Sequence, residues 1–110
     1  MIMVLLDEPT IILFDSQDNP PDCLEAVDVM NGEYFFCDDD GQRYVGAVTR
    51  SVGGSYPVEY RLRPDGEPSL SLAMNLAETA VMLVPNPWYA DLESLHRHLK
   101  NRSIVGARIR

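Results

Sequence analysis

The first forty-two residues contain no lysine or arginine, although they carry eleven carboxylates. The other sixty-eight residues carry six carboxylates and nine Lys or Arg, so the formal charge is −11 before residue 43 and +3 after it. A surface of one sign predicts a partner of the opposite sign. A net charge of −8 also argues against binding duplex nucleic acid, because Lys and Arg clusters supply most of that attraction.

Long apolar segments are also missing. Residues 1–6 are apolar, but this run lacks a basic start and ends at Asp7-Glu8, so we expect neither a signal peptide nor a membrane span. Cytoplasmic residence is then the default expectation. The two cysteines, Cys23 and Cys37, would stay reduced there, and we expect no disulfide.

The 110 residues, of which 45% are apolar, predict a single domain over 1–110 with a core of ordinary size. Apolar runs at 2–6 and 10–14 predict two short strands separated by a turn at residues 7–9. Residues 58–63 alternate apolar and charged side chains, as a half-buried strand does. Residues 70–74 alternate in the same way and predict a strand that returns after Pro64-Asp65-Gly66.

Two hairpins are predicted in the acidic region. Leu24–Met30 and Glu33–Asp38 flank Asn31-Gly32, the dipeptide typical of a two-residue turn. In that register the Cα atoms of Cys23 and Cys37 lie on the order of 10 Å apart, beyond disulfide reach. Gly41 then closes a second hairpin with residues 42–50, and the strands form a meander.

The C-terminal part predicts one amphipathic helix over Pro87–Lys100. Asn86 fits the cap and Pro87 the first helical position, and the apolar stripe comprises Trp88, Leu92, Leu95 and Leu99. Residues 75–84 are ambiguous, and we favour a helical turn followed by a buried strand. A final strand is expected over 104–109.

These elements predict an α+β fold: a mainly antiparallel, twisted sheet of about five to seven strands, with the C-terminal helix packed on one face. A small half-open barrel is the nearest variant. Residues 1–110 contain no internal repeat and no low-complexity segment.

Patterns for catalysis or metal binding are sparse. The run Asp38-Asp39-Asp40-Gly41 resembles a calcium loop, but an EF-hand register would place Phe36 and Ala47 at its first and last ligand positions. The two histidines are two residues apart on the predicted helix and point to nearly opposite sides. We therefore expect no cofactor, no metal and no catalytic residue.

The acidic hairpins are the predicted partner-binding surface. Carboxylates cluster around the two turns, and on strict alternation Phe35 points away from Phe36, so it is either covered on a second face or exposed to a partner. The predicted site comprises Asp28, Glu33, Phe35, Asp38, Asp39 and Asp40. We expect a small acidic protein-binding module, an adaptor, inhibitor or immunity-type protein, that docks a basic protein surface. The alternatives are a small-ligand or enzymatic domain with a pocket between sheet and helix, and a weak calcium-binding module.

Overall fold

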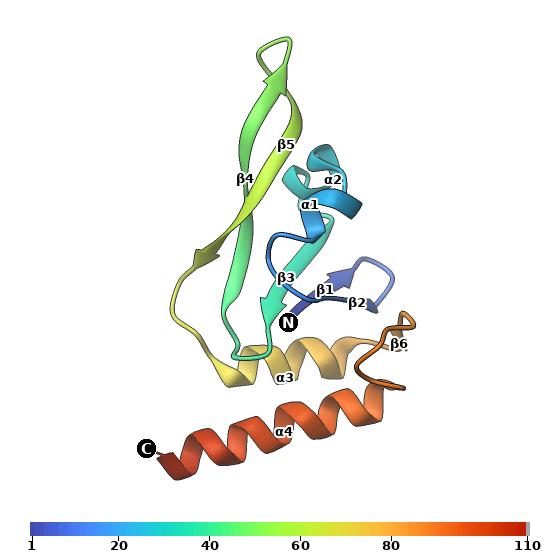
Figure 1. Ribbon diagram of the computed structural model, residues 1–110, viewed down its shortest axis with the longest axis vertical. Coiled ribbons are helices and arrows are strands. Elements are labelled where there is room, and N and C mark those ends of the chain that lie inside the picture. Colours follow the sequence, from blue (N-terminus) through green and yellow to red (C-terminus); the bar gives the residue numbers. More distant parts are fainter. Residues whose placement is uncertain (110) are drawn as a thin grey trace.

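Over residues 1–109 the protein has an α+β fold, with a six-stranded, mostly antiparallel open sheet and four helices (Figure 1). The computed structural model describes residues 1–109, and over 103–109 it describes the backbone alone. The strands are β1 (Ile2–Leu6), β2 (Thr10–Phe14), β3 (Tyr34–Asp38), β4 (Arg43–Val52), β5 (Tyr56–Asp65) and β6 (Met82–Leu83). The helices are α1 (Pro20–Cys23), α2 (Ala26–Met30), α3 (Leu70–Thr79) and α4 (Leu92–Ile109).

The strand order is β5-β4-β3-β1-β2-β6, and of these pairs only β2–β6 is parallel. The predicted class and the mainly antiparallel sheet are confirmed. Strands β1 and β2 have the predicted bounds, and the predicted hairpin at Gly41 joins β3 to β4. Gly41 has a φ of +82°, the left-handed conformation that favours glycine in a tight turn.

The hairpin predicted over Leu24–Asp38 is wrong in its first half. Residues 26–30 form α2, and β3 pairs with β1, so that Leu6 lies opposite Tyr34. Asn31-Gly32 ends this helix instead of joining two strands, because Asn31 is its C-cap and Gly32, with a φ of +76°, donates its backbone N–H to the carbonyl of Val29. Asn-Gly occurs both in two-residue hairpin turns and at the ends of helices, so the dipeptide alone does not distinguish the two structures.

The strand predicted over 70–74 is also wrong, because these residues begin α3. Its buried residues, Ala73, Leu76 and Ala77, follow the spacing i, i+3 and i+4 of one helix face. The buried strand predicted after it is reduced to β6, where Met82 is exposed.

The C-terminal helix begins and ends later than predicted. Asn86 accepts hydrogen bonds from the backbone N–H groups of Trp88 and Tyr89, but this is a turn, and α4 begins at Leu92. Asp91 caps α4 by accepting a 2.8 Å hydrogen bond from the backbone N–H of Ser94. The final strand predicted over 104–109 is wrong, since the helix continues through these residues.

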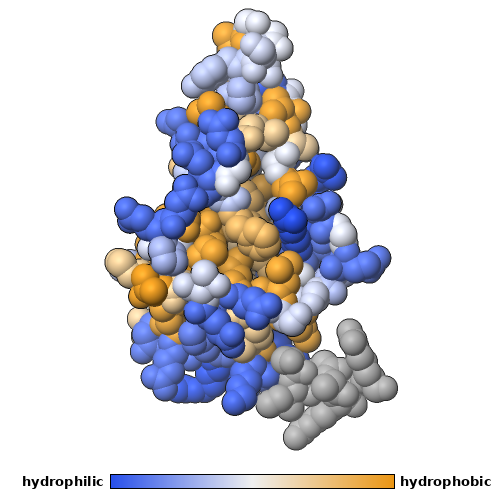
Figure 2. All heavy atoms as spheres, turned by 180° about the vertical axis from the view of Figure 1, so that it is seen from behind, coloured by the Kyte–Doolittle hydropathy of each residue, from blue (hydrophilic) through white to orange (hydrophobic). Residues whose placement is uncertain are grey.

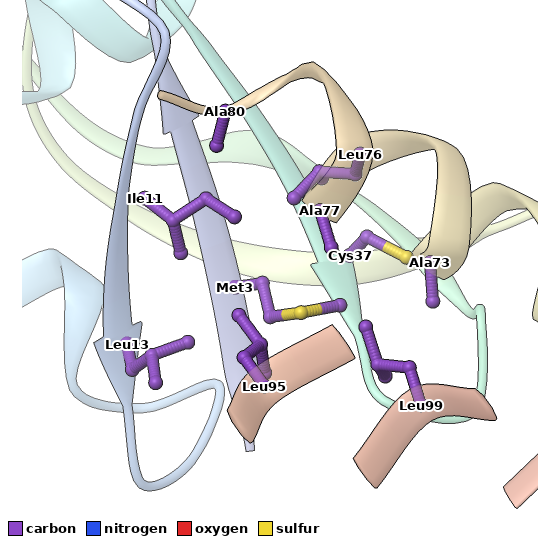
Figure 3. Close-up of a cluster of buried hydrophobic side chains, with 10 residues drawn as sticks. All are labelled: Met3, Ile11, Leu13, Cys37, Ala73, Leu76, Ala77, Ala80, Leu95 and Leu99. Atoms are coloured by element: carbon purple, nitrogen blue, oxygen red, sulfur yellow. The ribbon is translucent and has the colours of Figure 1, made fainter. Parts of the chain in front are cut away.

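Two hydrophobic cores lie on opposite faces of the sheet. In the first core, side chains from β1, β2 and β3 meet α3 and α4 (Figure 3). It comprises Met3, Ile11, Leu13, Cys37, Ala73, Leu76, Ala77, Ala80, Leu95 and Leu99. The second core lies against α2 and comprises Ile2, Val4, Ala26, Val29, Phe36, Tyr60 and Leu62. The prediction of a single helix on one face is therefore replaced by helices on both faces.

Strands β4 and β5, with the turn between them, form an arm that extends beyond the rest of the sheet (Figure 1). From behind, hydrophilic side chains cover much of the base, and hydrophobic side chains are exposed between this base and the arm (Figure 2). No helix within residues 1–109 has the length and hydrophobicity needed to cross a membrane.

Candidate functional site

The six residues predicted as the partner-binding site fall into two groups at opposite ends of β3. Asp28 and Glu33 lie at its start, and Asp38, Asp39 and Asp40 lie at its end. Phe35 lies between them, within the strand. The structure therefore does not bring the six side chains together into one surface.

Asp38 organises the β3–β4 turn. One oxygen of its carboxylate accepts hydrogen bonds of 2.9 Å from the backbone N–H groups of Asp40 and Gln42, and the other accepts a 3.3 Å bond from the Tyr44 hydroxyl. An aspartate that bonds the backbone two residues further on is the expected side chain at such a turn. Both oxygens of this carboxylate therefore have partners within the chain.

Asp39 and Asp40 hold α4 against the turn. The Asp39 carboxylate lies 3.2 Å from Nε2 of His98 and 3.6 Å from the guanidinium of Arg102, which also forms an ion pair with Asp40. Arg102 Nε donates a 3.0 Å hydrogen bond to the Asp39 backbone carbonyl, and the Met1 ammonium lies 3.6 Å from the Asp39 carboxylate. A calcium ion at this turn would have to displace Arg102 and His98 from these oxygens.

The environment of Asp39 favours its ionised form. Burial alone would raise the pKa of this carboxyl, but the His98 hydrogen bond and the nearby positive charges of the Met1 ammonium and Arg102 outweigh it, and the pKa is lowered. A group that is more acidic in the folded protein stabilises the fold when it is ionised. The acidic turn thus has a structural role.

Phe35 is half-buried and packs against the first core, whereas Phe36 belongs to the second. The guanidinium carbon of Arg43 lies 5.0 Å from the centre of the Phe35 ring, within the range of a cation–π interaction. Of the two predicted settings for Phe35, the covered second face is the one that the structure has. The Phe35 ring therefore packs within the fold and is not an exposed anchor for a partner.

At the other end of β3, Glu33 and Asp28 form a pair of like charges. The pKa of Glu33 is raised, first by a hydrogen bond between its carboxyl and that of Asp28, then by the Asp28 charge, a small effect of burial and the Asp7 charge. Two carboxylates so close together destabilise each other's ionised form. A cation placed between them would relieve this repulsion.

Tyr34 lies beside this pair and lines the same hollow. Burial is the main reason that the pKa of its hydroxyl is raised, and every charge that adds to the shift is acidic: Asp28, Glu33, Glu25 and Asp7. A hollow at this place is lined by Leu6, Asp7, Glu8, Asp28, Glu33 and Tyr34. We call Asp7, Glu8, Glu25, Asp28 and Glu33, together with Tyr34, the acidic face.

Sequence reasoning missed Asp7, Glu8, Glu25 and Tyr34, because it paired the strands wrongly. Since β1 pairs with β3, the turn after Leu6 lies next to the start of β3, and its two carboxylates join the pair formed by Asp28 and Glu33. The usable signal was that an apolar run ends at Asp7-Glu8 just as another begins after Glu33. Within the described part of the chain, these acidic residues form no ion pair.

The cysteine and histidine side chains are the further candidates for nucleophilic or metal-binding chemistry. Both cysteines are free; Cys23 is exposed, and Cys37 is buried, where burial first and then nearby carboxylates raise the pKa of its thiol to about 12. Such a thiol is almost wholly protonated at neutral pH and is a poor nucleophile. His96 Nε2 lies 2.8 Å from the Ala77 carbonyl and links α4 to α3. No cluster of three or more His, Cys, Asp or Glu suited to a metal ion occurs in the described part of the chain.

Comparison with protein-family models, with curated proteins and with solved structures finds no match to this chain. The role of the acidic face must therefore be inferred from its own geometry and charge.

Proposed function

We propose that this chain is a small acidic protein-binding module, an adaptor, inhibitor or immunity-type protein, that docks a basic surface of a partner protein in the cytoplasm. The acidic face is the docking surface. The observation that carries the proposal is that the hollow beside Tyr34 is lined by four carboxylates, those of Asp7, Glu8, Asp28 and Glu33, and that none of them forms an ion pair within the described residues.

The carboxylates of the acidic face suit recognition of Arg and Lys side chains. Arginine presents a planar fork of donors that matches a carboxylate, and an arginine can also stack on an aromatic ring. Tyr34 supplies such a ring and is itself held edge-on by Phe36, whose centroid is 6.3 Å away. The hollow at this place thus offers charge and a fixed aromatic surface together.

The charge distribution also favours fast association. Clustered charges of one sign steer an oppositely charged partner during diffusion and raise the association rate at low salt. Asp28 and Glu33 keep the role that the sequence predicted for them. Asp38, Asp39 and Asp40 add to the negative field, but their oxygens are already engaged within the chain.

The test compares two variants with the same net charge. Partners captured from the native host would be measured for association kinetics at two ionic strengths, with wild-type protein, with Asp28→Asn/Glu33→Gln and with Asp15→Asn/Asp18→Asn. Asp15 and Asp18 are exposed in the loop after β2 and lie outside the acidic face. We expect the first variant to slow association at least tenfold and to weaken its salt dependence, and the second to change it little.

Equal effects of the two variants would show that only net charge matters and would overturn the acidic face as the docking surface. Unchanged association with both would overturn the electrostatic mechanism. Circular dichroism of each variant verifies that the fold is retained.

A further inference from the structure

One face of the arm lacks the helices that cover the rest of that side of the sheet. The cross-strand pairs Val45–Arg63 and Ala47–Arg61 lie on the same face as Cys37, whose side chain packs under α3 and α4 in the first core. The helices that contact the arm, α1 and α2, do so on its opposite face, where Tyr60 and Leu62 are buried. We call the uncovered surface of Val45, Ala47, Arg61 and Arg63 the arm face.

The arm face carries positive charge without a partner. Arg61 and Arg63 are exposed, and within the described residues neither lies within 4.0 Å of a carboxylate. The other two arginines of the arm are paired: Arg43 with Asp65 at 4.0 Å and Arg50 with Glu59 at 3.0 Å. Val45 and Ala47 are half-buried and lie opposite Arg63 and Arg61 in the strand register, so apolar side chains lie beside the two arginines.

The arm face and the acidic face do not neutralise each other within one molecule. Within the described residues, no basic group lies within 4.0 Å of a carboxylate of the acidic face. By the alternation of β5, Arg61 and Arg63 lie on the face opposite Tyr60 and Leu62, which pack against α2, whereas Asp28 belongs to α2 itself. Arg61 also borders a hollow that it shares with Pro21 and Asp22 of α1. One chain therefore presents two unpaired surfaces of opposite sign.

We infer that the arm face binds the acidic face of a second copy of this chain. This inference rests on the proposed function, because it names the basic partner of the same acidic face. Because the two surfaces lie on opposite sides of the sheet, the contact is head-to-tail: the arm face of one copy binds the acidic face of the next. Arg61 and Arg63 then meet Asp28 and Glu33, and Val45 and Ala47 cover Tyr34.

Contact through the strand edge is disfavoured. Strand β5 is at the edge of the sheet, but it contains Pro57 and Pro64 and alternates charged side chains, features that protect an edge from pairing with another chain. The second copy therefore binds the face of the arm, where charge decides the contact.

The experiment is sedimentation velocity over a range of protein concentrations in about 0.1 M salt, where screening weakens the repulsion between two chains of net charge −8. Wild-type protein should sediment faster as its concentration rises. Arg61→Glu/Arg63→Glu and Asp28→Arg/Glu33→Arg should each weaken self-association at least tenfold. The control Arg97→Glu/Lys100→Glu changes the net charge by the same amount as Arg61→Glu/Arg63→Glu, but on α4. It should lose only the affinity that the added negative charge removes, and should therefore self-associate more strongly than Arg61→Glu/Arg63→Glu.

Mixing the arm-face variant with the acidic-face variant gives the decisive result. In the mixture each variant meets a complementary surface on the other, so association should return, although neither variant associates with itself. Mixtures that stay monomeric, or wild-type protein that is monomeric at every concentration, would overturn the inference. Slower capture of a basic partner by Asp28→Asn/Glu33→Gln would still support the proposed function in that case, so the two failures are distinguishable.

Discussion

The carboxylate of Asp39 lies 3.2 Å from Nε2 of His98, although the two residues are fifty-nine positions apart in the chain. This contact, together with the two ion pairs of Arg102, joins the most acidic turn of the protein to the most basic part of its last helix. The carboxylates that stand out most in the sequence are thereby used within the fold. The carboxylates around Tyr34 form no ion pair within the described residues.

The first prediction is that Asp39→Asn destabilises the protein. The change removes charge-assisted contacts to His98 and Arg102 from a side chain that is only 18% exposed, which should lower the free energy of unfolding by about 1–3 kcal/mol. Chemical denaturation measures this directly. Asp15→Asn, on an exposed side chain without an ion pair in the described residues, is the matched control and should stay within about 0.5 kcal/mol of wild type.

The second prediction concerns pH. Because the pKa of Asp39 is lower in the folded protein than in the unfolded chain, its contribution to stability is present above its ordinary pKa of about 3.9 and is lost as the pH falls through the lower folded value. The difference in unfolding free energy between wild type and Asp39→Asn should therefore shrink below about pH 4. A difference as large at pH 3 as at pH 7 would contradict this role for the carboxylate.

The sequence identified the strands that pair with their neighbours in the chain. The alternation in β5 and the glycine turn between β3 and β4 are local signals, and both predicted the structure correctly. The pairing of β1 with β3 is not local, because α1 and α2 lie between them. Five apolar residues in β1 and four in β3 fit several partners equally well, so composition could not select this pairing.

The errors at Leu24–Met30 and Leu70–Met74 have one physical origin. Short apolar segments satisfy a strand and a helix pattern alike, and tertiary packing decides between them. Ala26 and Val29 are buried one helical turn apart, as are Ala73 and Leu76. The sequence predicted only Asp28 and Glu33 of the acidic face, because these two residues are close together in the chain. Asp7 lies near them only because β1 pairs with β3.

The third prediction separates backbone strain from crowding at two glycines. Gly41 and Gly53 both have positive φ, at +82° and +62°, but a Cβ at Gly41 would overlap the backbone carbonyl of Ser69, whereas at Gly53 it would meet nothing within 4 Å. Gly53→Ala should cost about 1–2 kcal/mol through its backbone conformation alone. Gly41→Ala should cost at least about 3 kcal/mol, because the turn must also move away from the start of α3.

Thermal denaturation of these two variants provides the measurement, with Gly53→Ala as the control for Gly41→Ala. Equal losses would mean that the turn can shift freely from Ser69. The 3.0 Å hydrogen bond from the Ser69 backbone N–H to the Gly41 carbonyl would then contribute little to the position of α3.

The last prediction tests which residues hold α4 in place. Leu95 is 0% exposed and lies among sheet and α3 side chains, so Leu95→Ala should leave a cavity and cost about 2–5 kcal/mol (Figure 3). Trp88, which the sequence placed in the same stripe, is 44% exposed and precedes the helix, and Trp88→Ala should cost less than about 1 kcal/mol. Urea denaturation of both variants decides the matter. A larger loss of stability for Trp88→Ala than for Leu95→Ala would contradict this packing. The first core would then depend on Trp88 and the segment before Leu92, as the stripe predicted from the sequence implies.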